Sequence, residues 1–147
     1  MSDKIRFKLV APASINEDDY HNKNVVEIYI NNREIVSILK PIEERIKDYD
    51  DGVDPGGYGH RIAKELYHEL SKALIPGTCE NKYGAEILCC RSCGEPGCWS
   101  PMVKVTEEKE FVKWTLVHNH RKWDYKLTYR FKKEAYEAAL YSLKTMQ

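Results

Sequence analysis

The sequence lacks any apolar run long enough to cross a membrane, and its first residues lack the apolar centre of a secretory leader. Both absences favour a cytoplasmic protein without a membrane anchor. The cysteines number five, and an odd count without an export signal indicates reduced thiols rather than a disulfide framework. We therefore expect the thiols to serve in packing or in metal binding.

The sequence also lacks a phosphate-binding glycine loop and any recognisable spacing of a Ser/His/Asp or Cys/His catalytic set. His60 and His68 are eight residues apart, not the four of an H-E-x-x-H helix, and they indicate ordinary helix positions. An enzyme is therefore the less favoured class of protein.

No excess of charge of either sign is present, since 23 basic and 23 acidic residues cancel. Their distribution is uneven: residues 16–54 hold eleven acids against five bases, and residues 118–133 hold six bases against one acid. We interpret the two segments as solvated faces that attract a partner or each other.

What is present is the pattern of one α+β domain covering residues 1–147, with enough apolar residues for a single core. Alternating apolar side chains predict strands at residues 4–10, 26–30, 86–90, 102–106, 111–118 and 125–131. Apolar residues at helical spacing predict helices from residue 35 to 46, from residue 60 to Pro76, and from residue 133 onward. Pro41 requires the first helix to kink or to restart. The predicted fold class is α+β: an antiparallel sheet with a C-terminal meander and about three helices packed on one face.

The densest chemistry lies in residues 89–101, which hold four of the five cysteines together with two glycines and two prolines. Cys90 and Cys93 have two residues between them and are followed by glycine, which is typical of a knuckle that directs two thiolates at one zinc ion. Cys98 can reach the same ion by way of Gly97.

A closed tetrahedral zinc site needs a fourth ligand. The candidates are Cys89, Cys79, His118 and His120. No second C-x-x-C pair is present, so a second interpretation stays open: a tight loop shaped by its glycines, whose buried thiols act as small hydrophobic groups.

Residues 121–130 interleave basic and aromatic side chains, as a surface that binds single-stranded nucleic acid would. The same letters describe a strand of the meander with its aromatic side chains inward and its bases outward. The second interpretation is favoured, and nucleic acid is not an expected partner.

Several segments together resemble a family of small uncharacterised bacterial proteins with a C-G-x-x-G-C-W segment, here residues 93–99. The likeness also covers residues 28–33, Gly56-Gly57-Tyr58, Trp114, Arg121, residues 123–125, Phe131, Tyr136 and Ala139-Leu140. It implies a shared fold and no known activity. The family tends to have proline directly after the tryptophan and a cysteine two before the first motif cysteine; this chain has Ser100 and Arg91 there.

Small size, opposed charged segments and the lack of a catalytic set lead to one main hypothesis. It is a cytoplasmic, non-enzymatic domain that binds an unidentified partner protein, as one member of a bacterial immunity or defence pair. The alternatives are a zinc-binding protein that uses the cysteine stretch and a nucleic-acid-binding module that uses the basic aromatic strand. The oligomeric state stays open.

Overall fold

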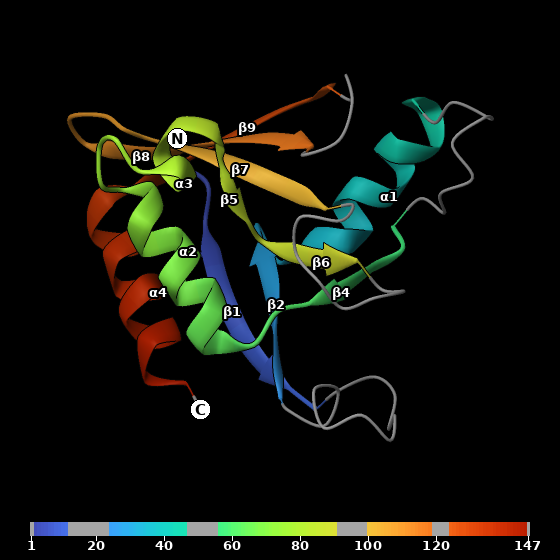
Figure 1. The fold of residues 1–147 in the computed structure, drawn as a ribbon, viewed down its shortest axis with the longest axis horizontal. Helices are drawn as coiled ribbons and strands as arrows, with labels where there is room; N and C mark the ends of the chain where they lie inside the picture. The colour runs from blue at the N-terminus through green and yellow to red at the C-terminus, as the bar shows by residue number, and fades with distance from the viewer. Residues whose placement is uncertain (1, 12–23, 47–55, 91–99, 119–123, 147) are drawn as a thin grey trace.

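The computed structural model describes residues 2–11, 24–46, 56–90, 100–118 and 124–146. Figure 1 shows helices packed against antiparallel strands, which confirms the α+β class expected from the sequence. Four helices lie in the described part rather than about three, because the short helix α3 (Cys79–Tyr83) has too few residues to show an apolar period.

The N-terminal sheet has the order β1 (Ile5–Val10), β2 (Val25–Ile30), β3 (Arg33–Glu34). The inward residues of β2 are buried and alternate with half-buried ones, as a strand with one face in the core requires. Asn31 and Asn32 both have positive φ, 52° and 66°, and form the two-residue turn that joins β2 to β3. This tight turn fixes the register in which Glu34 lies opposite Tyr29.

The C-terminal sheet is the expected meander with one added edge strand. Its order is β5 (Ala85–Glu86), β7 (Pro101–Glu107), β8 (Phe111–His118), β9 (Asp124–Lys132), with antiparallel pairing throughout. A separate two-stranded sheet pairs β4 (Tyr58–His60) with β6 (Leu88–Cys90).

Two helices pack side by side at one end of the molecule, and a third lies at the other end (Figure 1). The first two are α2 (Ala63–Ala73) and α4 (Lys133–Thr145), which contact each other, and α4 also covers β1, β8 and β9. The third is α1 (Ile35–Ile46), which contacts β2, β3 and β9. It is one continuous helix with Pro41 inside it, so it does not restart there.

The core is centred on Trp114, whose side chain is completely buried between Phe131 and Tyr136. Its ring meets both neighbours edge to face, and its Nε1 donates a hydrogen bond of 3.1 Å to the Tyr136 hydroxyl. A buried indole therefore has its one polar atom satisfied, as burial requires.

The helix expected from residue 60 begins three residues later, at Ala63. Tyr58, Gly59 and His60 form β4 instead, because their backbone pairs with β6 some thirty residues further along the chain. The interpretation of His60 as an ordinary helix residue is therefore wrong, whereas His68 lies on α2 with its side chain exposed.

Candidate functional site

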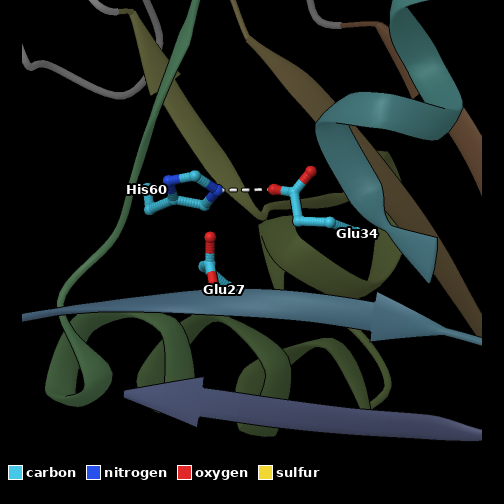
Figure 2. A group of neighbouring side chains, drawn as sticks. All are labelled: Glu27, Glu34 and His60. Atoms are coloured by element: carbon cyan, nitrogen blue, oxygen red, sulfur yellow. Dashed lines mark hydrogen bonds and ion pairs between the residues drawn. The ribbon is translucent and has the colours of Figure 1, made fainter. Parts of the chain in front are cut away.

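Three side chains from separate strands converge on one another: Glu27 of β2, Glu34 of β3 and His60 of β4. One donor atom of each lies within 4.8 Å of those of the other two. Figure 2 shows the His60 Nε2 in contact with Glu34 Oε1, at 2.6 Å, with the Glu27 carboxylate beside them. The His60 and Glu34 side chains are 22% and 15% exposed, so this Glu–Glu–His cluster is half-buried.

Strand register explains why these residues meet. One edge of β2 pairs with two segments of the chain. β3, which precedes α1, pairs with the end of β2, and Arg61, which follows α1 in the sequence, pairs with Val26 near its start. Continuing the antiparallel Val26–Arg61 pairing by one residue places His60 opposite Glu27. The turn between β2 and β3 then brings Glu34 beside them.

The Glu34 carboxylate is stabilised in its charged form. Burial alone would raise the pKa of Glu34, but hydrogen bonds from His60 and from the Ser37 amide, at 3.0 Å, outweigh it and hold the pKa below its ordinary value. Glu27, the second carboxylate, accepts a hydrogen bond of 3.0 Å from the Tyr29 hydroxyl. Two neighbouring carboxylates with one imidazole beside them favour a cation at the same place.

A second group of polar side chains is buried around Tyr58 of β4. Glu43 of α1 has no exposed surface and accepts three hydrogen bonds, from the Gly56 amide at 2.8 Å, the Tyr58 hydroxyl at 2.7 Å and the Tyr125 hydroxyl at 2.6 Å. The Tyr58 hydroxyl also lies 3.1 Å from His118 Nε2. Glu43, Tyr58, Tyr125 and His118 form what we term the Glu43 network.

The bonds of this network fix the protonation of His118. A phenol has one proton, and Tyr58 donates it to Glu43, so the Tyr58 oxygen is left as an acceptor towards His118. Nε2 of His118 must therefore carry a hydrogen. Nothing in this geometry requires a ligand, and we interpret the network as the internal support of β4, which carries both Tyr58 and His60.

The network also lies where the cysteine stretch leaves and rejoins the sheets. Cys90 pairs with Tyr58 at the end of β6, and Pro101 pairs with His118 at the start of β7. The backbone at both ends of the stretch is thus held by strands that contribute to the Glu43 network.

The predicted zinc ligands fall into two groups. Cys93, Cys98 and His120 lie outside the described residues, and of Cys90 the structure describes only the backbone. The zinc prediction for Cys90, Cys93 and Cys98 is therefore untested and stays a prediction.

Among the other candidates for the fourth zinc ligand, His118 is buried and engaged with Tyr58. Cys89 is also buried, and its Sγ lies 3.8 Å from the carbonyl oxygen of His60. Cys79 is exposed at the first residue of α3.

Sequence reasoning did not single out the Glu–Glu–His cluster. Glu27, Glu34 and Glu43 all belong to the acidic segment of residues 16–54, and the interpretation of that segment as a solvated face is wrong for Glu43, which is completely buried. One usable signal existed: Glu27 and Tyr29 alternate with buried residues on β2, which places both on one face.

No protein-family model, curated protein or solved structure gives a significant match to this chain. Within the described residues, none of the helices combines the length and the apolar character that spanning a membrane requires. The class that the geometry defines is thus an α+β protein with a half-buried cluster of two carboxylates and one imidazole.

Proposed function

We propose that the protein binds a divalent transition-metal ion through Glu27, Glu34 and His60. The observation that carries this proposal is the convergence of three metal-ligating side chains, from three separate strands, within 4.8 Å of one another. Two carboxylates bring two negative charges, which a divalent cation neutralises.

The dimensions of the cluster suit such an ion. Zinc-type ligand bonds are about 2.0–2.2 Å long, so two ligand atoms of one ion lie about 3–4 Å apart. The contact of 2.6 Å between His60 and Glu34 therefore opens by about 1 Å on binding, within the reach of side-chain rotation. Three protein ligands leave a coordination position for water or a small substrate, as in zinc sites that act on substrates rather than hold a fold together.

The donor set also narrows the choice of metal. Imidazole suits zinc, iron, copper and nickel, whereas carboxylates suit manganese and magnesium, so a mixed set favours zinc, manganese or iron over calcium. No thiolate belongs to this cluster, and copper(I) is not expected there.

Three predictions made from the sequence stay beside this proposal: a cytoplasmic location, a partner protein and zinc at the cysteine stretch. An odd number of cysteines supports a cytoplasmic location, in which thiols stay reduced. Binding of a partner protein, as in a bacterial immunity pair, rests on the opposed charged segments. Zinc at the cysteine stretch rests on the Cys90–Cys93 spacing.

The metal proposal predicts about one equivalent of Zn²⁺ or Mn²⁺ bound per chain when purified protein is titrated by calorimetry. Glu34→Gln and His60→Ala each remove a metal ligand. Loss of a residue that only supports a ligand weakens metal binding by about 10–100-fold, so loss of a ligand itself is expected to weaken it by more than that. Gln at position 34 keeps an oxygen that can accept from the Ser37 amide, so the start of α1 is preserved.

Matched controls exist at exposed positions of the same residue types. Glu44→Gln, on α1, and His68→Ala, on α2, are expected to bind metal as the original protein does. A variant with serine at Cys90, Cys93 and Cys98 separates the two candidate sites, since it retains binding at the Glu–Glu–His cluster. Unchanged affinity in both Glu34→Gln and His60→Ala would overturn the proposal.

A further inference from the structure

Two cations of β1, Arg6 and Lys8, share a sheet face with the Glu–Glu–His cluster. Lys8 is the direct cross-strand partner of Glu27, and Arg6 is that of Tyr29, so these four side chains lie on one face of the sheet. Side chains directly opposite each other on neighbouring strands have Cβ atoms about 4.5–5.5 Å apart, which long side chains easily span. Arg6 and Lys8 are both exposed and can contact a molecule that approaches the cluster.

Arg6 is held beside the cluster by Tyr29. Its guanidinium lies over the Tyr29 ring, 4.1 Å from the centre, and the hydroxyl of the same ring donates a hydrogen bond of 3.0 Å to Glu27 Oε1. A guanidinium stacked on a ring still presents the N–H groups at its rim, and their planar fork matches the oxygens of a phosphate. Tyr29 thus positions a phosphate-binding group next to one proposed metal ligand.

The net charge of this face changes when the metal binds. The two carboxylates of the cluster carry two negative charges, which Arg6 and Lys8 balance. His60 adds no charge, since a histidine that binds a metal must be neutral. A divalent ion therefore leaves the face with two positive charges in excess. The loaded site attracts a dianion, and the empty site does not.

We infer that the open coordination position of the metal receives the phosphoryl group of a small phosphomonoester, which Arg6 and Lys8 bind at the same time. This inference rests on the proposed metal function and adds to it the class of substrate. A phosphomonoester dianion has three terminal oxygens, enough for the metal, the guanidinium and the amine. A carboxylate has two oxygens and a single charge. The alternative is a pair of ordinary cross-strand contacts that only stabilise the sheet, and that alternative predicts no phosphate binding.

The test titrates phenylphosphonate, a phosphomonoester analogue whose carbon–phosphorus bond resists hydrolysis, into the whole protein with and without Mn²⁺. Calorimetry at slightly alkaline pH, where the probe is a dianion, is expected to detect binding to the Mn²⁺-loaded protein alone. Arg6→Gln and Lys8→Gln each remove a charged donor and are expected to weaken phosphonate binding by about tenfold. Their Mn²⁺ affinity, measured without the probe, is expected not to fall, because both variants remove a cation. By reciprocity, saturating phenylphosphonate should tighten Mn²⁺ binding in the original protein and do so less in both variants.

Two further variants and a second probe serve as controls. Lys104→Gln, at an exposed position of β7, a strand that carries none of the proposed ligands, is expected to bind phenylphosphonate as the original protein does. Arg6→Lys keeps the charge but loses the planar fork, so an intermediate affinity is expected. Benzoate has the same ring with a carboxylate in place of the phosphonate and is expected to bind more weakly.

The outcomes separate this inference from the metal function. Metal-dependent phosphonate binding that weakens in Arg6→Gln and Lys8→Gln, but not in Lys104→Gln, supports the inference. Three results overturn it and leave the metal function intact: no phosphonate binding to the loaded protein, equal binding without metal or in both glutamine variants of β1, or benzoate binding as tight as that of phenylphosphonate. Failure to bind either Mn²⁺ or Zn²⁺ overturns both.

Discussion

Glu43→Ala is expected to destabilise the protein by about 3–5 kcal/mol, because it leaves three buried donors without their acceptor and each such group costs about 1–3 kcal/mol. The carboxylate of Glu43 has no exposed surface and is the acceptor for three donors: the Gly56 amide and the hydroxyls of Tyr58 and Tyr125. Alanine cannot accept any of these three hydrogen bonds. It also leaves a cavity in which the three donors have no acceptor in place of the carboxylate.

Glu43→Gln separates the hydrogen-bond effect from the cavity. Glutamine has nearly the same volume, and its amide oxygen can accept from the Gly56 amide while its NH₂ faces the two phenols. Both phenols would then have to accept instead of donate, and Tyr58 could donate its proton to His118 only if the His118 ring changed tautomer and Nε2 lost its hydrogen. We expect a smaller loss for this variant, about 1–2 kcal/mol.

Urea denaturation monitored by tryptophan fluorescence measures both losses. Glu44→Ala is the matched control, since Glu44 is the next residue on α1 and is exposed, and it is expected to change stability by less than about 0.5 kcal/mol. A Glu43→Ala protein that is as stable as Glu44→Ala would show that the network contributes little to the fold.

The effect of Glu43→Ala should extend to the metal site. Two side chains of β4 contact the continuous segment formed by β3 and α1. His60 contacts Glu34 of β3, and Tyr58 contacts Glu43 of α1. Loss of the second contact loosens the strand that carries His60. The Glu43 network is thus the internal support that holds one ligand of the proposed metal centre.

The periodic elements were predictable from the sequence. Strands β1, β2, β8 and β9 and the helix α4 follow apolar patterns of period two or near 3.6, and these patterns depend only on neighbours along the chain. The α+β class follows from their order. In contrast, β4 has three residues with a glycine in the middle, and it is a strand only because β6 pairs with it.

The candidate site was less predictable for the same reason. Glu27 and Glu34 meet His60 because two segments line one edge of β2, and no local pattern records that a residue of β4 will pair there. The burial of Glu43 likewise depends on Tyr58 and Tyr125, which are 15 and 82 residues away along the chain. A charged residue in an acidic segment gives no sequence signal that its carboxylate is buried.

Raising the pH above about 10 is expected to unfold the protein steeply, because two buried tyrosines must stay protonated in the folded state. Burial, followed by the nearby Tyr58 and Glu43, raises the pKa of Tyr125 far above its ordinary value. Burial also raises the pKa of Tyr136, and the hydrogen bond from Trp114 only partly offsets this.

The sign follows from proton counting. Above about pH 10 the unfolded chain releases the protons of these two phenols while the folded chain retains them, so the unfolded state binds fewer protons and unfolding becomes easier as the pH rises. Their stabilising contribution is complete below the unfolded pKa of about 10 and is lost as the pH rises towards the folded values. Two such groups give a slope of about 2.7 kcal/mol per pH unit.

Denaturant titrations between about pH 9 and about pH 11 measure this slope. Tyr136→Phe removes one of the two phenols and should lower the slope by about half, at some cost in stability because Trp114 loses its acceptor. Tyr125→Phe should lower it similarly, and the double variant reports what all other groups contribute. If the slope is the same in all four proteins, the buried phenols do not govern alkaline stability. The expected result is a slope that falls in each single variant and falls further in the double variant, because a phenol enclosed in the core can ionise only after the core around it has opened.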